Sequence, residues 1–242
     1  MRGSKTKTLN VAAFALNVAL YVALGVLLSS VFPLTFGGVR FWPQVIIPAI
    51  FAVVFGPWVG GLGAGLGIFL NDVILGNNPL LSLMAGVTSN FIGFWLIGYI
   101  ANKKIRWAVP VVTYGVVTAL VAWVAYVYTS LIYAGIIVAC YVIFLAVVLS
   151  SSKWRSYEAG SVVGLLVGSA IIGSTVPLFA LFFTPLGGTP LAPFTLAGGL
   201  AVFIWTFSTE IPFLLVLGPP IIWAVYRAFP NFRSKEETRE QH

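Results

Sequence analysis

Long apolar stretches, separated by short polar breaks or by glycine and proline, follow one another along almost the whole chain. Their lengths are close to the roughly 20 apolar residues that a helix needs to cross the hydrocarbon core of a bilayer. Their periodicity is that of helices, so no strands are needed to explain them. The pattern predicts an all-α, polytopic transmembrane helical bundle. About eight spans are expected, at residues 9–31, 41–57, 58–76, 80–101, 107–128, 131–150, 158–183 and 194–227.

The composition excludes a water-soluble protein. Hydrophobic residues make up 60% of the 242 residues and charged residues only 8%, and the mean hydropathy is +1.02. A soluble domain carries about 25% charged residues on average. We therefore expect one transmembrane domain over residues 1–242, without a soluble catalytic module. The protein should be a multi-pass protein of the cell membrane, surrounded by the lipid bilayer.

The net charge of +7 is concentrated in the predicted loops. Cytoplasmic loops of membrane proteins carry an excess of Lys and Arg, so this charge indicates an orientation and not a nucleic-acid partner. Eight spans and a cytoplasmic N-terminus leave only Arg40 of the 13 basic residues outside. Both termini are then cytoplasmic, residues 229–242 form a charged cytoplasmic tail, and a tight inner turn is required at Gly56 and Pro57. The basic residues on the inner side are Arg2, Lys5, Lys7, Lys103, Lys104, Arg106, Lys153, Arg155, Arg227, Arg233, Lys235 and Arg239.

The chain offers few residues for catalysis or metal binding. Its single histidine is His242, and its single cysteine, Cys140, lies inside an apolar stretch where a small buried residue is the simpler interpretation. Zinc, haem and iron–sulfur sites need more such ligands. An enzyme would have to draw both its acid and its base from Asp72 and Glu210. We predict a non-catalytic protein with no metal site and no cofactor.

Three charged residues remain at membrane depth once the charges of the inner loops, including Glu158, are set aside. Ionisable groups at this depth are costly unless they are paired or face water, so they are candidates for function. Arg40 begins the second predicted span and Asp72 lies near the end of the third, so both should lie towards the outer face. They either form a salt bridge between two helices or contact a polar ligand. Glu210, at mid-depth in the last span, is either an interhelical carboxyl, a ligand contact or a proton-coupling site.

An amide and two indoles complete the candidate binding site. Asn90 lies at mid-depth in the fourth predicted span. Trp42 lies beside Arg40, and Trp95 follows Asn90 by about one helical turn. Both indoles could stack on a planar ligand, although the usual role of Trp in membrane proteins is to anchor helices at the interface. The predicted substrate-binding residues are Arg40, Trp42, Asp72, Asn90, Trp95 and Glu210.

Small residues recur at helical spacing in three parts of the chain. In lipid, close approach of backbones at Gly and Ala holds helices together, so each seam either packs inside the bundle or binds a partner subunit. The glycine-rich stretch 61–67 fits no nucleotide-binding motif, so the chain is not expected to hydrolyse ATP by itself. The three seams are Ala15, Ala19 and Ala23; Gly56, Gly60 and Ala64 with Gly61, Gly63, Gly65 and Gly67; and Gly160, Gly164 and Gly168.

Three motifs follow one another in the first 101 residues. They are RFWPQVIIP at 40–48, VFGPWVGG at 54–61 and GAGLGIFLND at 63–72. This order of Arg and prolines, then Phe-Gly-Pro, then a glycine-rich helix ending in Asp resembles the substrate-binding S component of energy-coupling factor transporters. The family's first helix also carries alanines spaced every four residues, as the first seam does here. The resemblance covers residues 1–101, and residues 102–228 hold the remaining helices.

The resemblance implies a small helical membrane protein that binds a vitamin, a vitamin precursor or a metal ion from outside. Such a subunit has no ATPase activity and docks on a transmembrane T component that is coupled to two cytoplasmic ATPases. The family's docking surface would fall on Ala15, Ala19 and Ala23. The family has six helices, so one pair is additional here, either 107–150 or part of 158–227. Because metal-binding members need nitrogen ligands and this chain lacks internal histidines, we expect a small organic solute.

Two other classes of function fit the same residues. A structural or assembly subunit of a larger membrane complex would use the small-residue seams and bind no small ligand. A stand-alone ion-coupled carrier would use Glu210 and would transport without an ATPase. The prediction from the sequence is a solute-binding subunit of an ATP-driven micronutrient importer, with these two as alternatives.

Overall fold

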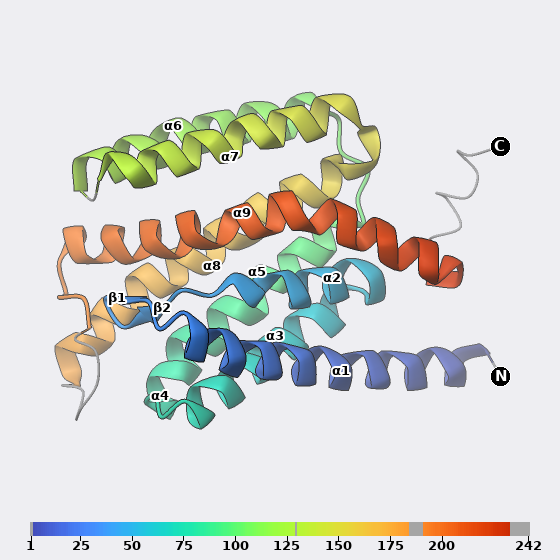
Figure 1. Cartoon of the computed structure of the whole chain (residues 1–242), viewed down its shortest axis with the longest axis horizontal. Helices are drawn as coiled ribbons and strands as arrows, with labels where there is room; N and C mark the ends of the chain where they lie inside the picture. Colours follow the sequence, from blue (N-terminus) through green and yellow to red (C-terminus); the bar gives the residue numbers. More distant parts are fainter. Residues whose placement is uncertain (1, 129, 184–190, 233–242) are drawn as a thin grey trace.

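The computed structural model describes residues 2–128, 130–183 and 191–232, with the side chains of 2–6, 113, 128 and 231 excepted. Its helices lie side by side as a bundle, and one small hairpin joins two of them (Figure 1). The helices are α1 (Arg2–Val31), α2 (Ile46–Phe55), α3 (Pro57–Ile74), the short α4 (Pro79–Leu81), α5 (Thr88–Ala101), α6 (Ala108–Tyr128), α7 (Leu131–Ser150), α8 (Arg155–Phe182) and α9 (Leu196–Ala228).

Within the described residues, seven helical segments are long and apolar enough to cross a membrane. Their length and hydropathy confirm the predicted all-α, polytopic class, and the protein is a multi-pass membrane protein. The fourth of the predicted spans is built from α4, a π-helical turn η2 (Ser82–Val87) and α5, which follow one another without a break. The segments are Lys7–Val31, Pro57–Ile74, Pro79–Ala101, Ala108–Val127, Leu131–Ser150, Ser152–Phe182 and Leu196–Ala228.

The predicted span at 41–57 differs from the others. The chain first forms a two-stranded hairpin of β1 (Thr35–Phe36) and β2 (Val39–Arg40), in which Gly37 and Gly38 take positive φ angles of +56° and +85°. The helix that follows covers only Pro43–Phe55, a 3-10 turn (η1) followed by α2. At about 1.5 Å per residue it is roughly 20 Å long, which is short of a 30 Å hydrocarbon core. Arg40 therefore lies in the hairpin and does not begin a transmembrane helix.

A tight turn between α2 and α3 is confirmed. Gly56 has a φ of +101°, which disfavours any residue with a Cβ, and Pro57 follows as the first residue of α3. The chain reverses here, so α2 and α3 run antiparallel. The start of α1 and the end of α9 consequently lie at the same end of the bundle (Figure 1).

The two ends of the bundle differ in what they hold. One end, which we call the hairpin end, holds β1, β2 and α4 (Figure 1). The opposite end, which we call the terminal end, holds the start of α1, the end of α9 and the α5–α6 and α7–α8 connections (Figure 1). These two connections contain the basic clusters at 103–106 and 153–155, and Ser156 donates a hydrogen bond to the Lys103 carbonyl between them. The cytoplasmic position of the terminal end stays a prediction from charge.

Glycines let the central helices approach closely. A methyl group at Gly164 on α8 would overlap the carbonyl oxygen of Gly93 on α5, and one at Gly160 would lie 2.9 Å from the Ile97 carbonyl oxygen. In α3, a methyl group at Gly60 would overlap Ala52 of α2, and one at Gly67 would lie 2.7 Å from the Tyr21 ring. Two of the three predicted seams are therefore internal packing surfaces. The first seam differs, because Ala15, Ala19 and Ala23 are exposed along α1.

Helices α6 and α7 form a peripheral pair. They pack on each other and on α9, beside the group formed by the other helices (Figure 1). Cys140 of α7 is buried, as predicted for a small core residue. The other long or intermediate helices among the described residues, α1, α2, α3, α5, α8 and α9, pack together without this pair, and we call them the six-helix group.

The position of Glu158 corrects the sequence interpretation, which treated it as an inner-loop charge. Helix α8 begins at Arg155, so Glu158 lies in its first turn and is fully buried. Neither carboxyl oxygen has a hydrogen-bond partner among the described residues. The first turn of α8 is covered because it packs against α9, where the Tyr157 hydroxyl donates to the Leu214 carbonyl at 2.8 Å. Because Glu158 stands at the edge of an apolar stretch in the sequence, its position along the chain did not reveal that the residue is packed inside the bundle.

Candidate functional site

A cavity of about 700 Å³ lies towards the hairpin end of the bundle. It is bounded by β2, α3, α4, η2, α5, α8, α9 and Leu191, and none of the described residues between 102 and 171 lines it. Its volume falls in the range of about 300–1,000 Å³ that is typical of sites for small organic ligands. Helices α6 and α7 thus lie outside both the six-helix group and its cavity.

Five of the six predicted substrate-binding residues line this one cavity. They come from parts of the chain that are far apart in sequence, from the hairpin to α9. Their convergence follows from the packing of α3 on α5, α5 on α8 and α8 on α9, together with the hairpin contacts to α9 and to the end of α3. The five are Arg40, Trp42, Asp72, Asn90 and Glu210.

Trp95 is the exception. It lies on α5, where its ring stacks on Tyr99 with centroids 5.0 Å apart and meets the Trp58 ring edge-on at 6.1 Å. Its Cβ lies against Gly61 of α3. Trp95 therefore packs between helices and is not part of the cavity lining.

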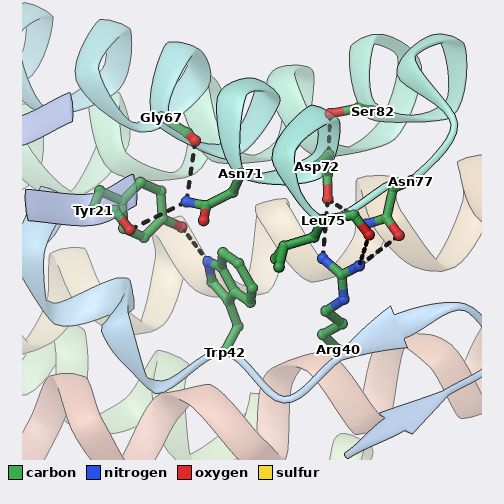
Figure 2. Close-up of polar contacts among 9 residues, drawn as sticks. All are labelled: Tyr21, Arg40, Trp42, Gly67, Asn71, Asp72, Leu75, Asn77 and Ser82. Carbon is green, nitrogen blue, oxygen red and sulfur yellow. Dashed lines mark hydrogen bonds and ion pairs between the residues drawn. The ribbon is translucent and has the colours of Figure 1, made fainter. Parts of the chain in front are cut away.

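Arg40 and Asp72 form an ion pair at the hairpin end of the cavity, with Nη1 of Arg40 3.8 Å from Oδ1 of Asp72 (Figure 2). Asn77 bridges the pair, since it accepts a hydrogen bond from Arg40 Nη2 at 2.6 Å and donates to Asp72 Oδ1 at 2.6 Å. The Ser82 hydroxyl donates to the second oxygen of Asp72, also at 2.6 Å. We call Arg40, Asp72, Asn77 and Ser82 the rim cluster. It joins the hairpin to the end of α3 and the start of η2.

The electrostatics of the rim cluster are balanced. Burial lowers the pKa of the Arg40 guanidinium, and the nearby Asp72 carboxylate acts in the opposite direction. Since arginine starts from a very high pKa, the guanidinium stays charged at neutral pH. Its positive charge is compensated by Asp72, and the Leu75 carbonyl accepts a further, longer hydrogen bond at 3.5 Å.

The turn after α3 places Asp72 and Asn77 together. Gly76 has a φ of +74°, and the Asn77 backbone amide donates to the Asp72 carbonyl at 2.8 Å. The Asn78 side chain then caps α4 by accepting hydrogen bonds from the amides of Leu80 and Leu81. Asn77 was not identified from the sequence as the bridge of the ion pair. The sequence does place Asn77 only five residues after Asp72, which was a hint that the two side chains could meet.

A second polar group lies deeper in the bundle. The Trp42 indole donates to the Tyr21 hydroxyl at 2.8 Å, and Tyr21 donates to Asn90 Oδ1 at 2.7 Å. Asn90 in turn donates to the Gly86 carbonyl at 2.9 Å. Trp42 is only 5% exposed and meets the Tyr21 ring edge-on at 6.1 Å. We call Tyr21, Trp42, Asn90 and Glu210 the inner group. Tyr21 was missed from the sequence, although a tyrosine at the middle of an apolar helix is far from an interfacial belt.

Asn71 fixes Tyr21 in place (Figure 2). Its side-chain amide donates to the Tyr21 carbonyl at 3.1 Å and to the Gly67 carbonyl at 3.2 Å. Asn71 is fully buried between α1 and α3. This contact holds the helix that carries Tyr21 at a fixed rotation relative to the helix that carries Asp72.

Glu210 is the remaining member of the inner group. The hydroxyls around it are used within α9, because Thr206 donates to the Val202 carbonyl at 3.0 Å and Ser208 to the Ile204 carbonyl at 2.6 Å. No described residue forms a hydrogen bond or ion pair with the Glu210 carboxyl, and the residue is 7% exposed. It lines the main cavity and, with Asn90, a small adjoining cavity of about 20 Å³ between α5, α8 and α9.

One wall of the cavity is apolar and aromatic. It comes from the last turns of α8 and the residues that follow, where the rings of Phe179 and Phe183 stack with centroids 4.6 Å apart. Ile172, Val176 and Phe182 complete this wall, which we call the apolar wall. This wall was not predicted from the sequence, because apolar residues that face a cavity cannot be told from those that face lipid by residue type. The cavity therefore joins one polar side to one apolar side.

Among the described residues, no group of three or more His, Cys, Asp or Glu side chains could hold a metal ion. No family model, curated protein or solved structure matches the chain. What is established is a multi-pass helical membrane protein with a cavity at one end. The resemblance of residues 1–101 to transporter S components stays a prediction from sequence.

Proposed function

We propose that the protein is the solute-binding membrane subunit of an ATP-driven micronutrient importer. The observation that carries this proposal is the 700 Å³ cavity, into which the hairpin, α3 and α9 bring Arg40, Asp72 and Glu210. Charged residues are costly at membrane depth and are usually kept there for a function. Charged groups and an apolar wall in one cavity suit the capture of a small organic solute.

Capture from outside is supported by the two ends of the bundle. The residues that line the cavity place it at the hairpin end. The basic α5–α6 and α7–α8 connections lie at the opposite end of the bundle (Figure 1). Basic loops favour the cytoplasmic side. The cavity then lies on the outer side of the membrane, with both chain ends in the cytoplasm.

Docking on a separate T component with its ATPases is supported by α1. Ala15, Ala19 and Ala23 lie every four residues along one stripe of this helix and are exposed. The glycines of α3, by contrast, are buried, with Gly63 against Asn17 and Gly67 against Tyr21. They leave no room for a phosphate group, in keeping with a subunit that relies on ATP hydrolysis elsewhere.

Native mass spectrometry of the protein, purified gently from its own membrane, tests the proposal. We expect a bound organic molecule of vitamin size, together with co-purifying T-type and ATPase subunits. A ligand-free chain at fixed stoichiometry in another complex would instead make it an assembly subunit. Ligand uptake by the isolated protein in liposomes, without any ATPase, would make it a stand-alone carrier.

Substitution of Ala19 tests the docking surface. Ala19→Leu adds bulk to the exposed stripe of α1, and small-residue interfaces depend on close backbone approach. We expect at least a several-fold loss of co-purifying subunits, with solute binding unchanged. Ala119→Leu, at an exposed position of the peripheral helix α6, is the matched control and should retain the subunits. Equal retention by both variants would remove the docking role of α1.

A further inference from the structure

The cavity lining carries an excess of one negative charge when its acidic residues are ionised. Its charged members among the described residues are Arg40, Asp72 and Glu210. The segment 184–190, which follows the apolar wall, contains only Thr, Pro, Leu and Gly and so has no ionisable side chain to change this balance. A solute that neutralises the cavity would carry one positive charge.

The rim cluster does not supply a partner for an anionic solute. Asp72 lies 3.8 Å from Arg40, and Asn77 and Leu75 accept hydrogen bonds from the Arg40 guanidinium. The Nη1 atom that forms the ion pair is buried and so does not face the open cavity. An anion that bound Arg40 would have to compete with a carboxylate already in place.

Neutral donors deeper in the site are also engaged. The indole N–H of Trp42, the hydroxyl of Tyr21 and the amide of Asn90 form one chain that ends on the Gly86 carbonyl. Glu210 stands beside this chain with no hydrogen-bond donor of its own among the described residues, although it is more than nine-tenths buried. A buried carboxylate without a partner is unfavourable, and a cation in the cavity would relieve that cost.

The rest of the lining suits an organic cation better than a hydrated metal ion. The apolar wall places the stacked rings of Phe179 and Phe183 on the cavity. Aromatic faces attract weakly hydrated organic cations and pack well against flat apolar groups. A metal ion would require several oxygen ligands, and Glu210 offers a single carboxyl group.

We infer that the solute is an organic cation whose positive group contacts the Glu210 carboxylate and whose apolar or aromatic body packs on the end of α8. This inference rests on the proposed function, because it names the chemical class of the solute for that same cavity. Recognition then depends on one charge–charge contact, while the rim cluster closes the hairpin end without adding net charge.

Three small probes of similar size and different charge test the inference. Benzyltrimethylammonium, benzyl alcohol and phenylacetate each have a phenyl ring, with a positive, neutral and negative substituent. Binding is measured by calorimetry on the purified full-length protein in nanodiscs. We expect benzyltrimethylammonium to bind in preference to the other two. In Glu210→Gln its affinity should fall by roughly 30-fold or more, because removal of one partner of a buried charge pair is costly.

Glu158→Gln is the matched control. It removes a second buried carboxyl that has no hydrogen-bond partner but does not line the cavity. Binding of benzyltrimethylammonium to this variant should equal that of the unchanged protein. Tighter binding of phenylacetate, equal binding of all three probes, or no effect of Glu210→Gln would overturn the cationic class.

Failure of this inference and failure of the proposed function are distinguishable. A neutral or anionic molecule retained in native mass spectrometry and displaced from the cavity would contradict the cationic class and leave the solute-binding function in place. No retained molecule and no probe binding to a folded protein would contradict both.

Discussion

Gly164→Leu is expected to prevent stable folding of the bundle. Gly164 of α8 faces Gly93 of α5, and any Cβ at this position would overlap the Gly93 carbonyl oxygen and approach Ile97 Cγ1 to 2.5 Å. The obstacle is backbone, which cannot move aside as a flexible side chain can. Overpacking typically costs about 1–3 kcal/mol and occasionally more, and an overlap with backbone belongs at the upper end of this range. We expect a large fall in thermal stability, or aggregation, in size-exclusion chromatography and thermal unfolding in detergent.

Gly135→Leu is the matched control. Gly135 lies on α7, is exposed, and has no heavy atom within 4 Å of where a Cβ would be. Because leucine has a higher helix propensity than glycine, this change should be neutral or stabilising by up to about 1 kcal/mol. Gly164→Ala should show an intermediate loss. Unchanged unfolding of Gly164→Leu would mean that α5 and α8 do not pack at this seam.

Breaking the rim cluster is expected to loosen the hairpin and weaken solute binding. In Asp72→Asn the charge of Arg40 is left uncompensated, and in Arg40→Met the carboxylate of Asp72 loses its cation. The two side chains are only 20% and 14% exposed, so each single change should cost about 1–2 kcal/mol of stability. Hydrogen exchange of residues 35–42 should become faster in both variants.

A variant that carries both substitutions tests whether Arg40 and Asp72 stabilise the protein as a pair or independently of each other. Residues in one ion-pair network couple, so Arg40→Met with Asp72→Asn should cost less than the sum of the single changes, by about 1 kcal/mol. Lys7→Met, which removes an exposed cation from α1, should leave stability and hydrogen exchange at the hairpin unchanged. Additive effects of the two single changes would mean that Arg40 and Asp72 act separately.

Residue type alone predicted the cavity residues that are charged or strongly polar, because such side chains are energetically costly inside a membrane. Arg40, Asp72, Asn90 and Glu210 stand out in an apolar sequence because polar groups at this depth need partners or water, and the structure brings all four to one cavity. The same reasoning failed for Glu158, which was assigned to a loop because it stands at the edge of an apolar stretch. The structure buries it in the first turn of α8.

Aromatic residues were harder to assign, because their type does not show which way they face. Trp95 follows Asn90 by five residues on α5, which places the two about 140° apart around the helix. Asn90 faces the cavity and Trp95 consequently faces α3 and packs on Tyr99. Trp95 was wrongly included in the candidate site, whereas Tyr21 was overlooked. A tyrosine has only one hydroxyl and is otherwise apolar, so it does not stand out as a polar residue in an apolar helix.

The sequence by itself determined that the protein crosses the membrane many times, where most helices lie, where the chain turns at Gly56, and which polar residues are exceptional. These properties depend on hydrophobicity and charge read along one dimension, against a bilayer of known thickness. The tertiary structure alone decided that Arg40 pairs with Asp72 through Asn77, that α6 and α7 lie outside the cavity, and that Glu210 is left without a partner among the described residues. Those outcomes depend on how each helix is rotated and how closely it packs on its neighbours. Contacts at glycines between segments that are distant in the sequence determine both.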